Sequence, residues 1–142
     1  MKINIYTDGS SRGNPGPASL GVVIKDKKEK VLGAWKKLIG IATNNQAEYQ
    51  ALIFGLEKAK KLRVEDPEER KRRRAEEVDC FTDSKLVVEQ INRRFKIKDK
   101  KLAILFIKAW NLSQSFKKIN FYYLAREDNK EADNLANQAY NP

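Results

Sequence analysis

Apolar and polar residues alternate at the start of the chain. Residues 2–8 place Ile3 and Ile5 on one face of an extended segment and Tyr6 and Asp8 on the other. A period of two residues is typical of a β-strand with one buried face. The pattern therefore predicts a first strand over residues 2–8, with Asp8 at its end.

Two further β-type runs follow a loop at residues 9–17 that is rich in Gly, Pro, Ser and Asn. Residues 20–25 and residues 31–38 are both rich in apolar side chains, and four charged residues at 26–29 connect them. Two strand-like runs with a short polar connection are typical of a hairpin. The first third of the chain thus predicts three consecutive antiparallel strands.

The pattern becomes helical at Asn45, after which apolar residues recur at intervals of three and four up to Leu62. The same criteria predict strands at residues 78–82 and 119–124, and helices at residues 84–92, 102–114 and 129–140. Three antiparallel strands followed by this alternation predict an α/β fold. Its mixed five-stranded sheet is flanked by helices, and helical crossovers join the parallel strands.

Residues 63–78 form a polar stretch with six basic and six acidic residues. The run of five basic residues at 70–74 suggests a nucleic-acid patch, but acids four positions before arginines favour ion pairs on a solvated helix. The stretch as a whole is neutral. We therefore predict a charged, helical insertion within a single domain that spans residues 1–142.

The composition narrows the class of protein. The chain has 142 residues, of which 29 are Lys or Arg and 19 are Asp or Glu, so its formal net charge is +10. With 41% hydrophobic residues it is a globular chain, and its charge favours nucleic acid as a partner. A single cysteine, Cys80, and the absence of histidine exclude disulfide frameworks, zinc fingers and Ser-His-Asp triads.

The sequence carries no sign of a membrane or secretory protein. The first residues lack the apolar core of a signal peptide, and no apolar run approaches the ~18–20 residues that cross a bilayer. We expect a cytoplasmic protein without membrane contact.

Four acids stand where predicted strands end or predicted helices begin: Asp8, Glu48, Asp83 and Asp133. In open α/β sheets these ends meet at one edge, where ligands bind. Carboxylates that converge there repel one another unless hard cations neutralise them, and oxygen ligands without His or Cys select Mg²⁺ or Mn²⁺. The pattern therefore indicates a divalent-metal site.

Each acid also has a structural interpretation. Asn45 and Glu48 have the spacing of a capping box, as do Asp128 and Glu131, and Asp83 could cap the helix that follows it. Taken singly, these interpretations are favoured for all but the first acid. The occurrence of all four acids in this order, at one edge, favours a site.

The chain resembles the type 1 ribonucleases H over nearly its whole length except residues 63–78. Four motifs carry the resemblance: Tyr-Thr-Asp-Gly-Ser at 6–10 with Gly-Asn-Pro-Gly-Pro at 13–17, Thr-Asn-Asn-Gln-Ala-Glu at 43–48, Thr-Asp-Ser at 82–84, and Asn-Lys-Glu-Ala-Asp at 129–133. No single motif is decisive, but all four in this order are highly specific. The resemblance implies the ribonuclease H-like fold.

The resemblance also implies an activity, namely endonucleolytic hydrolysis of the RNA strand of RNA–DNA hybrids. Two Mg²⁺ ions, which Mn²⁺ can replace, would leave 5′-phosphate and 3′-hydroxyl ends. By analogy Asp8 would bridge both ions, Glu48 and Asp83 would complete one site, and Asp133 the other. We expect a monomer that uses no zinc.

Short polar residues beside the acids suit the reading of 2′-hydroxyl groups, which distinguish RNA from DNA. By analogy with the family, Thr43 would hold a phosphate of the DNA strand. The remaining candidates for substrate binding are Ser11, Asn14, Asn44, Asn45, Gln46 and Ser84. Turn and cap chemistry is the alternative role for these side chains.

Besides the insertion at 63–78, two features depart from the better-known relatives. Many of them carry a mobile histidine before the last helix, where this chain has Arg126 and Glu127, so we expect altered turnover without loss of activity. A basic segment that grips the substrate is here reduced to residues 93–101, which still carry a net charge of +5. We expect Lys96 and Lys98 to contact phosphates of the hybrid.

Three other functions are compatible with parts of the pattern. A non-catalytic hybrid- or duplex-binding module could use the same fold, although it would gain by losing acids that repel phosphates. A phosphatase with an aspartate nucleophile would need a second acid two residues from Asp8, where Tyr6 and Ser10 stand. A resolvase- or integrase-like nuclease would share the metals but lack the loop at 13–17.

Overall fold

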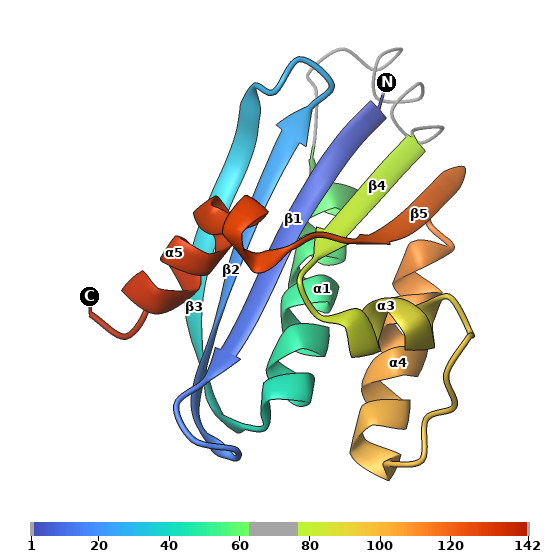
Figure 1. Ribbon diagram of the computed structural model, residues 1–142. Helices are drawn as coiled ribbons and strands as arrows, with labels where there is room; N and C mark the ends of the chain where they lie inside the picture. The colour runs from blue at the N-terminus through green and yellow to red at the C-terminus, as the bar shows by residue number, and fades with distance from the viewer. Residues whose placement is uncertain (1, 63–76, 142) are drawn as a thin grey trace.

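The computed structural model describes residues 2–62 and 77–141, and its centre is one five-stranded sheet (Figure 1). The strands are β1 (Lys2–Ser11), β2 (Gly16–Asp26), β3 (Val31–Ala42), β4 (Glu77–Thr82) and β5 (Lys118–Tyr123), in the spatial order β3-β2-β1-β4-β5. β1 pairs antiparallel with β2, and β2 with β3, whereas β4 pairs parallel with both β1 and β5. The predicted mixed α/β sheet is confirmed.

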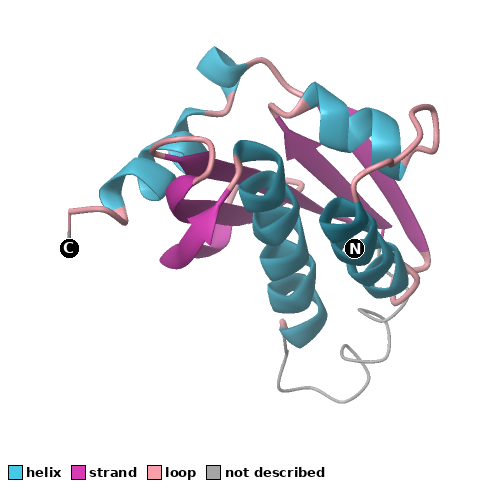
Figure 2. Cartoon of the chain, turned by 90° about the horizontal axis from the view of Figure 1, so that it is seen from below, coloured by secondary structure: helices cyan, strands magenta, loops and turns pink. Residues whose placement is uncertain are grey.

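Helices cover both faces of this sheet (Figures 1 and 2). They are α1 (Asn44–Lys61), α3 (Lys85–Ile91), α4 (Lys100–Ser113) and α5 (Lys130–Gln138), and a 3₁₀ turn, η1 (Arg126–Asp128), precedes α5. α1 and α4 pack against each other on one face, and α5 lies across β2 on the other. Within the described residues, no helix has the length and apolar character needed to span a membrane.

The predicted ends of the elements differ from the observed ones where hydrogen bonds outside the apolar pattern decide them. β1 continues to Ser11 because Ser10 and Ser11 pair with Ser19 and Ala18 of β2. The sequence pattern predicts a loop for this polar stretch, so the prediction of the end of β1 is wrong by three residues. The extra pairs matter for the site, because they fix the segment that follows Asp8 against its neighbour.

The start of a helix also differs from its prediction because of hydrogen bonds outside the apolar pattern. α4 begins at Lys100, two residues earlier than predicted, because Asp99 caps it and accepts hydrogen bonds from the amides of Lys101 (2.8 Å) and Leu102 (3.1 Å). The predicted insertion at 63–78 lies outside the described residues except for its last two, which belong to β4.

Apolar residues of β1, β2 and β4 pack against α1, α3 and α4 in one buried cluster. Its fully buried members include Ile3, Ile5, Val22, Ile24, Leu52, Leu56, Val78 and Val87. Cys80, which the sequence placed in mid-strand, is buried there as well. A hydroxyl group within this core finds a partner, since Tyr49 donates a hydrogen bond of 2.7 Å to Gln90 Oε1.

The backbone of α5 packs directly against the backbone of β2. A Cβ atom at Gly21 would lie 2.1 Å from the carbonyl oxygen of Ala132, so only glycine fits at this crossing. Next to it, Ser19 Oγ donates a hydrogen bond of 2.6 Å to the carbonyl oxygen of Ala136. These contacts set the height of α5 above the sheet, and with it the position of the residues in its first turn.

We expect Gly21→Ala to destabilise the protein by about 1–3 kcal/mol, because the new methyl group must push α5 away from β2. The free energy of unfolding in urea measures the effect. Asn137→Ala, at an exposed position of α5, is the control and should change it by less than about 0.5 kcal/mol. Equal stability of both variants would contradict the packing described here.

Candidate active site

The first turn of α1 sits directly on the end of β1. A Cβ atom at Gly9 would lie 2.2 Å from the backbone of Ala47, so a side chain at this position would separate the two elements. The Gly9 amide donates a hydrogen bond to Glu48 Oε1. This contact places the Glu48 carboxylate beside Asp8, and both residues are buried.

The N-terminus of α1 is capped by residues other than those predicted. Thr43 Oγ1 accepts a hydrogen bond from the Gln46 amide (3.1 Å), and Gln46 Oε1 accepts one from the Thr43 amide (3.0 Å). The prediction of a capping box between Asn45 and Glu48 is therefore wrong. Because Thr43 and Gln46 satisfy the cap, Glu48 is available for the interior of the site.

Asp83 reaches the same place from the neighbouring strand. β1 and β4 are parallel, with Thr7 opposite Thr82, so the residues that follow, Asp8 and Asp83, lie at the same edge. Ser84, and not Asp83, caps α3 by accepting a hydrogen bond from the Val87 amide (3.2 Å). The carboxylate oxygens of Asp8, Glu48 and Asp83 lie within 4.8 Å of one another.

The fourth acid, Asp133, enters the site from the first turn of α5. Asn129 Nδ2 donates a hydrogen bond of 3.0 Å to the carbonyl oxygen of Thr7, which ties the start of α5 to the strand that ends at Asp8. Arg126 Nη2 lies 3.4 Å from Asp133 Oδ1. The predicted capping box of Asp128 and Glu131 is wrong, since the N-cap residue is Asn129 and its own side chain makes no capping hydrogen bond.

Burial and mutual repulsion shift the proton affinity of this cluster. Burial raises the pKa of Asp8 to about 8, with the negative charges of Asp83 and Asp133 as further causes. Burial also raises the pKa of Glu48 well above its usual value, as do Asp8 and Asp83, while the hydrogen bond from Gly9 opposes the shift. The fold thus holds carboxylates where their charges are costly unless a proton or a cation compensates them.

The donor set fits hard divalent cations. All ligand atoms are carboxylate oxygens, the atoms that Mg²⁺ and Mn²⁺ prefer, and three of them are close enough to share one ion. The raised pKa of Asp8 reflects the electrostatic strain that a bound cation would relieve.

A hydrogen-bonded network of short polar residues borders the cluster. Asn44 Oδ1 accepts a hydrogen bond from the Ser11 amide (3.1 Å), and Asn14 Oδ1 accepts one from the Asn44 amide (3.0 Å). Ser11 Oγ donates to the carbonyl oxygen of Ala42 (2.7 Å), and Asn45 is exposed. The structure therefore links the loop after β1 to the start of α1, as the positions of the candidate residues require.

Lys96 and Lys98 stand apart from this network. Both are exposed in the connection between α3 and α4, on a different element from each of the four acids.

The sequence analysis did not anticipate the roles of Gly9 and Asn129, which hold α1 and α5 against β1. Their places in the motifs at 6–10 and 129–133 were the available signal.

The shifted pKa values predict an unusual pH dependence of stability. Without divalent cations the folded protein binds more protons than the unfolded chain between about pH 4 and pH 8, so its stability falls as the pH rises. Asp8→Asn removes one of the titrating groups. In urea unfolding with a chelator at pH 8, we expect the variant to be more stable than wild type by more than about 1 kcal/mol.

At pH 4 the two proteins should differ much less, since Asp8 is then protonated in the folded state. Glu57→Gln, at a partly exposed position of α1, is the matched control and should not produce this pH-dependent gain. A constant difference between Asp8→Asn and wild type at both pH values would refute the interpretation.

Comparison with known proteins identifies the family. Residues 6–139 match a family model described as reverse transcriptase-like. The chain is 44% identical to the bifunctional protein Rv2228c of Mycobacterium tuberculosis over 140 residues, which cover 98% of this chain and 35% of that protein. It is 36% identical to ribonuclease HI of Halobacterium salinarum, covering 97% of this chain and 64% of the relative. The chain thus spans about a third to two-thirds of the length of these relatives.

Solved structures agree with this result. The N-terminal RNase H domain of Rv2228c superposes with a TM-score of 0.85 at 42% identity, over 98% of each chain. RNase H1 of Halobacterium salinarum gives 0.86 at 34% identity, over 99% of this chain and 98% of that one. LC11-RNase H1, solved in complex with an RNA/DNA hybrid, gives 0.82 at 39% identity, over 96% and 95%. On its fold, motifs and relatives, the chain belongs to the type 1 ribonuclease H family.

Proposed function

We propose that this chain is an endoribonuclease that hydrolyses the RNA strand of RNA–DNA hybrids and leaves 5′-phosphate and 3′-hydroxyl ends. The observation that carries the proposal is the convergence of Asp8, Glu48 and Asp83 within 4.8 Å, at the sheet edge of a type 1 ribonuclease H fold. The solved complex of LC11-RNase H1 with an RNA/DNA hybrid supports the substrate class.

Asp8, Glu48, Asp83 and Asp133 would hold two Mg²⁺ ions, for which Mn²⁺ can substitute. When bound, such ions supply Lewis-acid activation of water and stabilise the charge on the leaving oxygen. The oxygen-only donor set and the raised pKa of Asp8 support this assignment. No protein base is needed for such chemistry, which suits a chain without histidine.

The chain's own residues hold the carboxylates of Glu48 and Asp133 in place before substrate arrives. Glu48 is held at Oε1 by the Gly9 amide and approached at Oε2 by the Thr82 hydroxyl, at 3.4 Å. Asp133 is held through α5, which Asn129 ties to β1. Such preorganisation lets the site act without rearranging its own groups during the reaction.

The polar residues beside the acids would bind the hybrid. The hydrogen bonds among Ser11, Asn14 and Asn44 use the amide oxygens, so the amide hydrogens of both asparagines are the groups oriented for a ligand. The cap at Thr43 and Gln46 likewise uses their oxygens as acceptors, and their hydrogens would bind phosphate or sugar oxygens. We assign Asn45 and Ser84 to the same surface, on which 2′-hydroxyl groups identify the RNA strand.

We further propose that residues 1–142 form a single domain, which includes an insertion at 63–78, and that it acts as a monomer in the cytoplasm without zinc. All four acids come from one chain, and one core joins strands from both ends of it. The chain has no histidine, and its one cysteine is buried. The cytoplasm is proposed because it contains the nucleic acids from which hybrids form.

Cleavage of a hybrid with a labelled RNA strand tests the proposal. We expect wild type to cut the RNA strand with Mg²⁺ or Mn²⁺, and Asp8→Asn to be at least about a thousandfold slower, since it removes a charge that metal-assisted catalysis uses. Hybrid binding without cleavage by wild type would assign the chain to the binding modules. Comparable cleavage of duplex DNA would indicate a resolvase- or integrase-like nuclease instead.

A second measurement tests the basic segment at residues 93–101. Affinity for a hybrid, measured against salt concentration with Ca²⁺ or with the Asp8→Asn variant to prevent cleavage, gives a slope that reports phosphate contacts. We expect the double substitution Lys96→Ala and Lys98→Ala to reduce this slope by about 1–2. The control pair, Lys27→Ala and Lys28→Ala, lies in the β2–β3 turn at the far end of the sheet and should leave the slope unchanged. An unchanged slope for the first pair would remove these lysines from the substrate footprint.

A further inference from the structure

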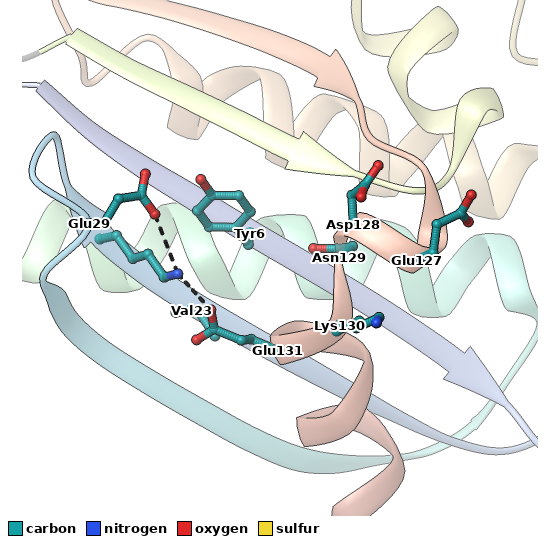
Figure 3. Close-up of a pocket in the computed structure, with 9 residues that line it drawn as sticks. Tyr6, Val23, Glu29, Glu127, Asp128, Asn129, Lys130 and Glu131 are labelled. Atoms are coloured by element: carbon teal, nitrogen blue, oxygen red, sulfur yellow. Dashed lines mark hydrogen bonds and ion pairs between the residues drawn. The ribbon is translucent and has the colours of Figure 1, made fainter.

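A cavity of about 220 Å³ lies on the α5 face of the sheet, separate from the carboxylate cluster (Figure 3). Tyr6 and Val23 of the sheet form its floor, Glu29 stands at one side, and residues 127–131, at the start of α5, form the other. Lys25 lines the cavity as well. None of the four proposed metal ligands lines it. The proposed function does not use this cavity.

One wall of the cavity carries a buried acceptor that lacks a donor. Asn129 is 2% exposed, and its Nδ2 group donates to Thr7, but no donor among the described residues bonds to its Oδ1 atom. Figure 3 shows this oxygen on the side of the Asn129 side chain that faces Tyr6. A buried oxygen without a partner costs free energy, so the cavity favours a ligand that donates hydrogen bonds.

The charge of the cavity is opposite to that of the chain. Four of the lining residues are acidic, namely Glu29, Glu127, Asp128 and Glu131, and two are basic, namely Lys25 and Lys130. The result is a local net charge of −2 in a chain whose net charge is +10. Such a lining attracts cations and repels the phosphates of nucleic acid.

The protein's own side chain shows how an ammonium group binds at the outer part of the cavity. Lys25 Nζ lies 2.6 Å from Glu131 Oε1 and 3.5 Å from Glu29 Oε2, and it stands 5.5 Å from the centre of the Tyr6 ring (Figure 3). The ring face of Tyr6 thus favours a positive charge beside it.

The geometry favours an organic cation over a metal ion. Among the described residues, the acids of this cavity form no set of three whose ligand atoms lie within 4.8 Å, in contrast to Asp8, Glu48 and Asp83. A volume of about 220 Å³ has room for a short linear chain. The acidic residues stand on both sides of the cavity, so a molecule with an ammonium group at each end matches them.

We propose that this cavity is a binding site for a linear aliphatic diamine or polyamine. One ammonium group donates a hydrogen bond to Asn129 Oδ1, the alkyl chain lies along Val23 and the Tyr6 ring, and the other ammonium group pairs with the outer carboxylates. A polyamine in this site bears directly on the residue that ties α5 to β1.

Titration of the ¹⁵N-labelled protein with 1,4-diaminobutane tests the proposal. The experiment is run at constant ionic strength with saturating Mg²⁺, so that the carboxylate cluster is not the preferred cation site. We expect saturable shifts in the backbone amides of Tyr6, Asn129 and Lys130 and in the side-chain amide of Asn129. 1,4-Butanediol, which has the same length without charge, should not produce them.

Two substitutions that change the charge of the cavity in opposite directions make the test more specific. Glu131→Gln makes the cavity less negative and should weaken diamine affinity about threefold, whereas Lys25→Met removes a competing ammonium group and should strengthen it by a similar factor. Glu57→Gln makes the same charge change on α1, outside the cavity, and should leave the affinity unchanged. The dispersion of the amide spectrum shows that each variant is folded.

Several results would contradict the proposal. In the titration, these are shifts confined to the amides around Asp8, Glu48 and Asp83, shifts that do not saturate, or equal shifts with the diol. Among the variants, it is an equal loss of diamine affinity in Glu131→Gln and Glu57→Gln. Each would show that the diamine acts through general charge effects or at the metal site.

Discussion

The close approach of α1 to the end of β1 is the contact on which the rest of the site depends. Gly9 has no side chain to hold the helix away, and its amide binds the carboxylate of Glu48. The first turn of α1 can therefore bury an acid next to Asp8, at the edge where β4 delivers Asp83. A larger residue at this one position would separate elements that are 39 residues apart in sequence.

This arrangement concentrates negative charge in a buried place, and the fold must offset the cost. The raised pKa values of Asp8 and Glu48 reflect the unfavourable burial of their ionised forms in the folded protein. The cap at Thr43 and Gln46 and the core beneath α1 stabilise the elements that carry the acids. A buried cluster of acids whose ionised forms are unfavourable is typical of sites selected for function over stability.

α5 completes the site and joins it to the second cavity. Asn129 bonds to Thr7, one residue before Asp8, and stands in the wall of the cavity that Tyr6 floors. Arg126 occupies the loop in which many relatives carry a histidine, and it lies 3.4 Å from Asp133. The start of α5 thus carries residues of both the proposed metal site and the second cavity.

The sequence by itself determined the order and type of the elements, the mixed sheet and the family. The alternation at residues 2–8 and the helical spacing after Asn45 are hydrophobic patterns within single segments, so they can be read without knowing the tertiary contacts. The sequence also named the four acids, because their motifs occur in a fixed order. It misjudged the caps of α1 and α5, since several nearby residues can cap a helix and only the packed structure selects among them. Tertiary structure alone decided the spacing of the carboxylates, the need for glycine at 9 and 21, and the Asn129 oxygen that finds no donor among the described residues, because each depends on contacts between segments distant in the chain.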